Sequence, residues 1–244
     1  ERVRTPKIPI FVYHSLDTSQ NSISLSPHIF KQQLAYLRKR RYKLQSAGQA
    51  VDAYFEKQIT HKCVVLTFDD AYTTIASSIE DLLTHQQTAT IFVATSVIGK
   101  SNLWDIDLKH IDQIEIMHSD HLRALNEKGC ELGAHTHSHP KLTEIHPEDL
   151  KDELCEGRTQ IEQHFGKKTD IIAYPYGDHN DRVKDATSGA GYAAGFTTQL
   201  GYLTPQSEVL AIPRFPTHID LQLFRLIVHG GYGWYRKIQD RLFG

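Results

Sequence analysis

The heptapeptide VVLTFDD, from Val64 to Asp70, joins a run of strand-forming residues to two adjacent carboxylates. The run over 64–68 is mostly apolar and β-branched, which is typical of a strand in a buried sheet. Adjacent carboxylates at one site repel each other unless a cation lies between them. We therefore interpret Asp70 as a metal ligand and Asp69 as a general base, with the N-cap of a following helix as the alternative role.

Segments of the same kind recur along the chain and alternate with amphipathic stretches. The predicted strands are Ile8–His14, Val64–Phe68, Thr90–Ala94, Glu131–His135, Ile171–Pro175, Ala193–Thr198 and Ala211–Phe215, and the clearest helix is Pro27–Tyr42. Apolar strands separated by helices indicate an α/β fold with a parallel sheet, either closed into a barrel or left open. In both forms, the residues that do chemistry lie just past the carboxyl ends of the strands.

Length and composition favour one domain and exclude some classes of partner. The 244 residues are 40% hydrophobic, and no repeat or Pro/Gly-rich linker divides them, so we predict a single domain over residues 1–244. A formal net charge of -2 provides no global field for nucleic acid or an anionic membrane surface. No run approaches the roughly 18 apolar residues of a membrane span, and residues 1–4 lack the apolar stretch of a signal peptide.

A cluster of three histidines follows the strand predicted over Glu131–His135. The sequence His135-Thr136-His137-Ser138-His139 places three imidazoles within five residues. Neutral imidazole is the commonest nitrogen ligand for zinc and similar metals, and side chains at a strand exit can converge on one ion. A polar turn is the alternative interpretation, but so dense a cluster after a buried strand favours a metal site.

His135 and His139, with one Asp70 oxygen, would form a site of two nitrogens and one oxygen. Such a site keeps positions open for water and substrate, as a catalytic metal requires. The same ligands also serve non-haem iron oxygenases, so the ligand set alone leaves hydrolysis and oxidation open. Asp69 favours hydrolysis, because a base beside a metal-bound water activates that water, and the sequence contains no clear signature for a reducing co-substrate.

Two segments resemble the first two motifs of the polysaccharide deacetylase family, namely Thr67-Phe68-Asp69-Asp70 and His135-Thr136-His137-Ser138-His139. The family is also called the NodB homology domain or carbohydrate esterase family four. The resemblance covers nearly the whole chain, with Ala71 where the family usually has Gly. It implies a distorted (β/α) barrel with about seven parallel strands.

The resemblance also assigns roles to the residues of these motifs. It implies Asp69 as the general base. It implies a divalent metal, with zinc expected first and cobalt, nickel or iron as alternatives, held by Asp70, His135 and His139. His137 occupies a variable position of the second motif, so we expect it not to bind the metal.

A third family motif, Arg-x-Pro-Tyr, is matched by Pro175 and Tyr176 in the segment Ala173-Tyr174-Pro175-Tyr176-Gly177. Ala173 stands where the family has the arginine that orients the catalytic acid residue. We expect Arg214, at the end of a late strand, to compensate for this loss. By the same resemblance, the backbone amide of Tyr176 helps to hold the oxyanion of the tetrahedral intermediate.

Two histidines are candidates for the general acid that the resemblance implies. His14 ends the segment Phe11-Val12-Tyr13-His14, and His229 ends Leu226-Ile227-Val228-His229. The first segment resembles the Tyr-His motif of the branch that deacetylates poly-β-1,6-N-acetylglucosamine, and so does the Ala-Tyr-Pro-Tyr-Gly form of the third motif. We therefore predict His14 as the acid, with a buried core histidine as its alternative role and His229 as the second candidate.

The resemblance implies a hydrolase that removes N-acetyl groups from an N-acetylglucosamine-type carbohydrate and releases acetate. One alternative is an O-acetyl esterase or another amidase on the same scaffold. Another is a carbohydrate-binding relative without catalysis, for which Ala173 is the best argument. Aromatic side chains that could stack on sugar rings or fill the core are Trp104, Tyr174 and Tyr176. The family favours the cell envelope or secretion as the location.

Overall fold

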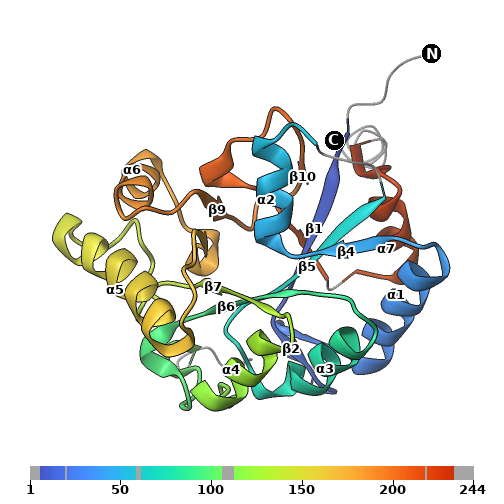
Figure 1. Ribbon diagram of the computed structural model, residues 1–244, viewed down its shortest axis with the longest axis horizontal. Helices are drawn as coiled ribbons and strands as arrows, with labels where there is room; N and C mark the ends of the chain where they lie inside the picture. Colours follow the sequence, from blue (N-terminus) through green and yellow to red (C-terminus); the bar gives the residue numbers. More distant parts are fainter. Residues whose placement is uncertain (1–5, 20, 59–61, 106–112, 218, 234–244) are drawn as a thin grey trace.

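A curled, mostly parallel sheet lies at the centre of the protein, with helices around its outer side (Figure 1). The computed structural model describes residues 6–19, 21–58, 62–105, 113–217 and 219–233. Its helices are α1 (Pro27–Lys39), α2 (Ala47–Phe55), α3 (Ala76–Thr84), α4 (Ser119–Glu127), α5 (Pro147–Phe165), α6 (Asp181–Gly189) and α7 (Leu221–Val228). Its strands are β1 (Ile8–Tyr13), β2 (Ser15–Leu16), β3 (Ser24–Leu25), β4 (Lys43–Gln45), β5 (Cys63–Phe68), β6 (Thr90–Val93), β7 (Glu131–Ala134), β8 (Ile171–Ala173), β9 (Ala194–Phe196), β10 (Tyr202–Leu203) and β11 (Phe215–Pro216).

The main sheet follows a path of seven strands in the order β10-β1-β5-β6-β7-β8-β9. Every neighbouring pair on this path is parallel except β1 and β10. β4 and β6 pair with the same edge of β5. β4 pairs with the first half of β5 and β6 with its second half. The predicted distorted (β/α) barrel with about seven strands is therefore confirmed.

The segment between Ile212 and Pro216 brings the two ends of the curl together. Ile212 forms a parallel bridge with Phe196 of β9, and Phe215 pairs in parallel with Phe11 of β1. The sequence predicted one continuous strand over Ala211–Phe215, and this was wrong in its extent. Pro213 has no N–H to donate to a ladder, so the pairing is split into a single bridge and the short β11.

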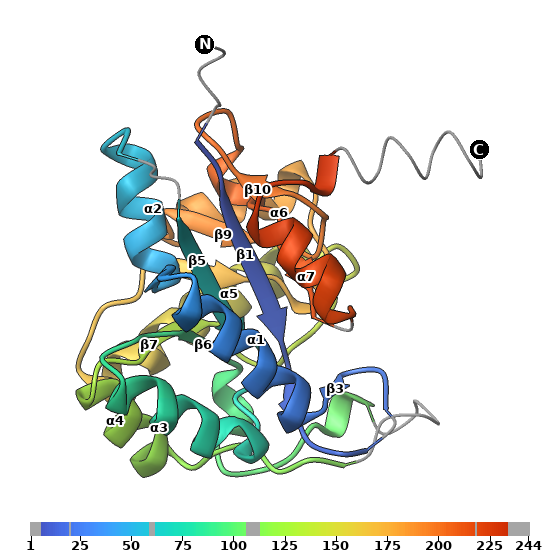
Figure 2. The ribbon, with the colours of Figure 1, turned by 90° about the vertical axis from the view of Figure 1, so that its right-hand side faces the viewer.

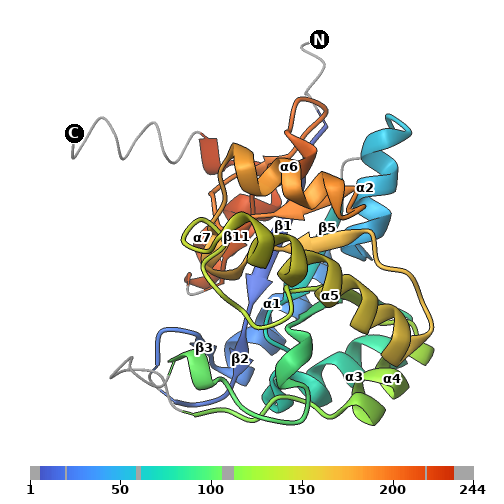
Figure 3. The ribbon, with the colours of Figure 1, turned by 90° about the vertical axis from the view of Figure 1, so that its left-hand side faces the viewer.

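Side chains on the two faces of β5 enter different clusters, because alternate residues of a strand point to opposite faces. Val65 belongs to an inner cluster with Phe92 of β6 and Phe196 of β9. Val64 and Leu66 belong to an outer cluster that the helices cover. Figures 2 and 3 show α1, α3, α4 and α5 around the outside of the curled sheet. The barrel interior is thus filled by side chains and gives its carboxyl end a rigid support.

Helix α1 shows how local sequence sets the bounds of an element. Ser26 caps its first turn by accepting a hydrogen bond from the amide of His28, and Pro27 occupies a position that needs no donor. The sequence predicted this helix to reach Tyr42, but it ends at Lys39 because Arg41 adopts a left-handed conformation with φ of 55°.

No helix among the described residues combines the length and the apolar character that crossing a bilayer requires.

The inner cluster generates a prediction about stability. Phe92 is fully buried, so Phe92→Ala should lower the free energy of unfolding by about 3–5 kcal/mol through lost burial and the cavity left behind. Phe55 provides a matched control because its side chain is 54% exposed, and Phe55→Ala should cost less than about 1 kcal/mol. Urea unfolding of both variants measures the difference, and similar losses would contradict the assignment of Phe92 to the barrel interior.

Candidate active site

The carboxyl ends of the parallel strands bring the candidate residues to one edge of the barrel. His14 follows β1, the two aspartates Asp69 and Asp70 follow β5, the histidines His135 and His139 follow β7, and Tyr176 follows β8. Arg214 directly precedes β11, which lies beside β1. Parallel strands end at the same side of a sheet, so residues far apart in the sequence meet there.

Asp70, His135 and His139 form a compact buried group. One ligand atom from each residue can be chosen so that all three lie within 4.8 Å of one another. The Nε2 atom of His135 lies 3.5 Å from Oδ1 of Asp70, and the Nε2 atom of His139 lies 3.3 Å from the same oxygen. All three residues are at most 5% exposed, so water does not screen this arrangement.

The protonation of His135 decides what this group can bind. Its Nδ1 lies 2.7 Å from the carbonyl oxygen of Ala173, which can only accept, so Nδ1 carries the proton. Burial lowers the pKa of His135 and keeps its ring neutral. The Nε2 lone pair therefore faces a carboxylate oxygen of Asp70. Two acceptors face each other there, an arrangement that a cation between them would stabilise.

His139 also indicates a site for a cation. Burial and the neighbouring His135 hold its pKa well below its ordinary value, so this ring is neutral too. Its Nδ1 is buried and makes no hydrogen bond within the described part of the chain. One carboxylate oxygen and two neutral imidazoles are a donor set that suits zinc and related divalent metals. The residues present therefore fit a divalent cation.

Asp69 is held by a buried, two-pronged ion pair with Arg214. The guanidinium donates from Nη1 to Oδ1 at 2.7 Å and from Nη2 to Oδ2 at 2.8 Å. Burial alone would raise the pKa of Asp69, but the opposing charge of Arg214 and its hydrogen bonds outweigh burial and hold the pKa below its usual value. Asp69 is therefore an oriented carboxylate anion, whereas the adjacent Asp70 faces the histidines.

Arg214 reaches Asp69 from the segment that joins the ends of the curl. Its side chain is fully buried, donates from Nε to the carbonyl oxygen of Thr197 at 2.9 Å, and donates from Nη1 to Oγ1 of Thr67 at 3.1 Å. Its guanidinium carbon lies 5.7 Å from the ring centre of Phe92. The expected compensation thus has a geometric basis, since a guanidinium contacts Asp69 although the third motif carries Ala173.

The two candidates for the general acid lie in different surroundings. His14 is half-buried. It contributes to lowering the pKa of Asp69, after the larger effects of burial, Arg214 and His135. It also contributes to lowering the pKa of His139, after burial, His135 and Asp69. His229 is exposed at the end of α7. The hydroxyl of Tyr36 in α1 contacts its Nε2, and the hydroxyl of Tyr42, just after α1, contacts its Nδ1. His14 thus acts on two residues of the site, whereas the contacts of His229 are with these two tyrosines.

Aromatic rings flank His139 on two sides. The Trp104 ring stacks on the imidazole with a centroid distance of 4.2 Å and an interplanar angle of 23°. The Tyr176 ring meets it edge-on at 4.8 Å and is 46% exposed. Tyr174 instead fills the core and donates its hydroxyl to the carbonyl oxygen of Leu210. The sequence marked Trp104 as a sugar-stacking candidate but contained no signal for its contact with His139.

Backbone conformations that are rare for side-chain-bearing residues gather at this site. Nine non-glycine residues in the described ranges have φ above zero. Five of them belong to the site or adjoin it: Asp70 at 69°, Ala71 at 57°, Thr136 at 65°, His139 at 64° and Tyr176 at 60°. Such conformations persist only where the surrounding structure holds them, and they concentrate at functional sites. Ala71 keeps a conformation that glycine favours, which explains why Gly is usual at this position of the motif.

Comparison with known protein families matches residues 56–195 to the family described as polysaccharide deacetylase, which is more than half of the chain. The chain belongs to the polysaccharide deacetylase family. The resemblance inferred from the two motifs is confirmed, and the protein is a deacetylase of that family. The matched residues include both aspartates and the histidine cluster, whereas Arg214 lies beyond them.

Individual relatives agree with this assignment. A Bacillus subtilis protein, YxkH, which its name assigns only provisionally to the polysaccharide deacetylases, is 28% identical over 210 residues, or 85% of this chain and 70% of the relative. The poly-beta-1,6-N-acetyl-D-glucosamine N-deacetylase of Staphylococcus aureus is 24% identical over 216 residues, covering 84% of this chain and 71% of the relative. The fold is also that of IcaB from Ammonifex degensii, whose structure superposes with a TM-score of 0.78 at 18% identity, covering 93% of this chain and 97% of that one.

The buried ion pair generates a second prediction. Arg214→Met should lower the free energy of unfolding by about 3–5 kcal/mol, because it leaves the Asp69 carboxylate buried without its partner. Arg41→Met, at an exposed arginine, should stay within about 0.5 kcal/mol of the parent. Denaturant unfolding in the presence of a chelator measures both. Equal effects of the two substitutions would contradict a dependence of the fold on the ion pair.

Proposed function

We propose that the protein is a metal-dependent N-deacetylase that acts on N-acetylglucosamine-type polymers or oligomers and releases acetate. The observation that carries the proposal is the convergence of one carboxylate oxygen and two neutral imidazoles beside a second carboxylate that arginine holds. The Staphylococcus aureus relative, which is named for poly-beta-1,6-N-acetyl-D-glucosamine, supports the choice of sugar. We also propose, from length and composition, a single domain over residues 1–244 and, from the family resemblance, a location in the cell envelope or outside the cell.

In this proposal Asp70, His135 and His139 hold the divalent cation, with zinc as the first choice for this donor set. The cation, when bound, supplies Lewis acidity that polarises the acetamide carbonyl and acidifies water. The hydrogen bond from His135 Nδ1 to the Ala173 carbonyl fixes the ring so that Nε2 faces the site. Cobalt, nickel and iron remain candidates that metal analysis distinguishes.

Asp69 acts as the general base in this proposal. A carboxylate oxygen of Asp69 takes a proton from the attacking water. Arg214 supports the role in two ways, since its charge keeps Asp69 ionised and its two parallel hydrogen bonds fix the plane of the carboxylate. An oriented base loses little rotational freedom when substrate binds, which favours the reaction.

His14 and Tyr176 complete the proposed set of catalytic groups. His14 donates a proton to the departing amine nitrogen, so that the sugar leaves as an amine and the acetyl group as acetate. The half-buried position of His14 after β1 and its electrostatic effect on Asp69 support this choice. The backbone amide of Tyr176 donates to the oxyanion that develops on the acetyl carbon. The rings of Trp104 and Tyr176 beside His139 offer faces on which a sugar can stack.

The two alternatives weighed from the sequence receive less support. The first alternative is a carbohydrate-binding relative without catalysis, which the missing motif arginine at Ala173 favoured. In the structure, Arg214 provides Asp69 with a guanidinium partner, so the missing arginine no longer favours this alternative. An O-acetyl esterase would use the same site to remove an acetyl group from a sugar oxygen instead of a nitrogen. The name of the Staphylococcus aureus relative favours the amide over the ester, and product analysis separates the two.

The proposal predicts acetate release from N-acetylglucosamine oligomers by zinc-reconstituted protein. Asp69→Asn should lower the rate by about 10²- to 10⁴-fold, because it removes the base and leaves the side-chain shape nearly unchanged. Chelation should abolish the activity, and zinc should restore it. The measurement couples acetate detection to an assay for free amine on the sugar.

The matched control is Asp185→Asn, which makes the same chemical change at an exposed aspartate of α6 and should leave the rate unchanged. Absence of acetate from zinc-loaded protein would contradict the proposed reaction. Acetate released from an O-acetylated sugar, but not from the N-acetylglucosamine oligomers, would point to an ester substrate. A wild-type rate in Asp69→Asn would remove Asp69 from the role of base.

A further inference from the structure

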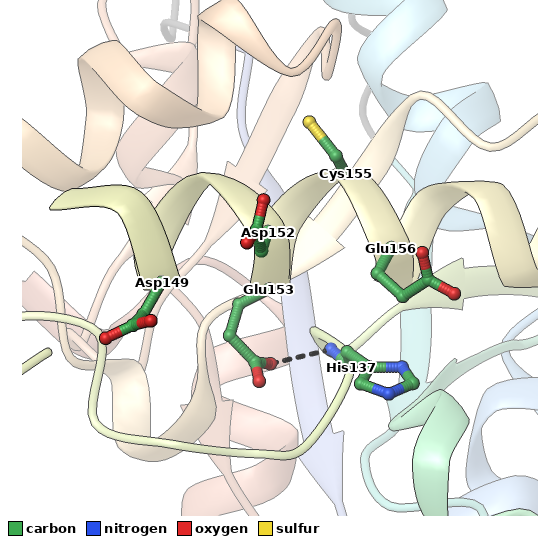
Figure 4. Close-up of a pocket in the computed structure, with 6 residues that line it drawn as sticks. All are labelled: His137, Asp149, Asp152, Glu153, Cys155 and Glu156. Atoms are coloured by element: carbon green, nitrogen blue, oxygen red, sulfur yellow. Dashed lines mark hydrogen bonds between the residues drawn. The ribbon is translucent and has the colours of Figure 1, made fainter. Parts of the chain in front are cut away.

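The segment 135–139, which contains the two proposed histidine ligands, packs against helix α5. Glu153 of α5 accepts hydrogen bonds at Oε2 from the backbone amides of His137 at 3.0 Å and Ser138 at 2.8 Å. Its Oε1 accepts from the hydroxyl of Ser138 at 2.5 Å. Figure 4 shows the Glu153 carboxylate turned toward the backbone of His137. One side chain of α5 thus binds the middle of the segment 135–139, between the two proposed ligands.

A glycine in the same helix lets α5 approach this segment closely. Gly157 lies one turn beyond Glu153, and a Cβ atom there would lie 2.8 Å from the carbonyl carbon of Thr136 and 2.9 Å from its oxygen. Both neighbours are backbone atoms, which cannot move aside as a flexible side chain would. The close approach holds the backbone of Thr136 in place while the Glu153 carboxylate fixes the next two residues.

The segment needs such support because of its own conformation. Thr136 and His139 both adopt left-handed backbone angles, with φ of 65° and 64°. The hydroxyl of Thr136 accepts a hydrogen bond from the amide of His139 at 3.1 Å, which closes the turn from within. Left-handed residues other than glycine persist where their surroundings determine them. The contacts with α5 are therefore part of what sets the separation of the two imidazoles.

Other carboxylates lie close to Glu153 without this contact. A surface cavity of about 360 Å³ is lined by His137, Cys155 and four acidic residues, namely Asp149, Asp152, Glu153 and Glu156 (Figure 4). Among the hydrogen bonds of the described residues, those from segment 135–139 to this acidic group all go to Glu153. Glu153 is thereby distinguished from its neighbours by geometry, although all four carry the same charge.

We propose that Glu153 is a positioning residue for the metal site. Through the amides of His137 and Ser138, its carboxylate sets the relative placement of His135 and His139 and thereby raises the affinity of the site for a divalent cation. This inference rests on the proposed metal-dependent function. Groups that orient metal ligands from outside the ligand set typically change metal affinity or activity by about 10- to 100-fold when removed.

Zinc titration of chelator-treated protein by calorimetry tests this role. Glu153→Ala should weaken zinc binding by about 10- to 100-fold. Glu153→Gln should have a smaller effect, because its amide oxygen can still accept from the backbone and its amide nitrogen can donate to the Ser138 hydroxyl. Asp152→Ala is the matched control, since it removes one negative charge from the same cavity at the adjacent, exposed residue, and its zinc affinity should equal that of the parent.

Thermal unfolding of the metal-free variants separates positioning from a merely structural role. Weaker zinc binding by Glu153→Ala in protein that is folded at the titration temperature supports positioning. A lowered melting temperature with unchanged zinc affinity would overturn it, as would equal losses of affinity in Glu153→Ala and Asp152→Ala. If Glu153→Ala does not fold, Glu153→Gln carries the same comparison. Absence of zinc binding by the parent would overturn the proposed metal site itself, whereas parent-like binding by both Glu153 variants would overturn only the positioning role.

Discussion

The buried ion pair between Asp69 and Arg214 links the charge of the site to the segment that joins β9 and β1. Two adjacent carboxylates at a strand end would repel each other, and the guanidinium offsets the charge of one of them. Asp70 is then left to face two neutral imidazoles. Burial of the pair is costly, but two parallel hydrogen bonds, the Thr67 hydroxyl and the Thr197 carbonyl satisfy the guanidinium.

The same ion pair connects the closure of the barrel to the chemistry of its edge. Arg214 belongs to the short segment that bridges β9 and β1, and its side chain extends to Asp69 at the end of β5. A change that opened the curl would therefore withdraw the guanidinium from Asp69. The left-handed backbone angles at Asp70, His139 and Tyr176 show that the site holds conformations which an isolated loop would not keep. The filled barrel below the site provides the rigidity that these conformations require.

The sequence predicted the parts of this arrangement that arise from local patterns. Apolar runs identified strands such as β5 and β7, and the carboxyl-end rule predicted that Asp70 and the histidines would meet. The closing segment was predicted less well, because Pro213 interrupts its pairing and short bridges leave no periodic pattern. The stacking of Trp104 on His139 was not predictable either, since it depends on the course of an irregular segment. The sequence also did not predict the contact of Glu153 with the segment 135–139, because an acidic residue on an amphipathic helix is normally expected to face solvent.

We propose that the two adjacent aspartates have separate roles, in which Asp70 binds the cation and Asp69 stays with Arg214. Anomalous diffraction from crystals of zinc-loaded protein, recorded on both sides of the zinc absorption edge, tests these roles. We expect one strong peak within coordination distance of Asp70, His135 and His139, with both hydrogen bonds between Arg214 and Asp69 retained. A peak coordinated by Asp69, or zinc bound with the Asp69–Arg214 pair broken, would contradict these roles.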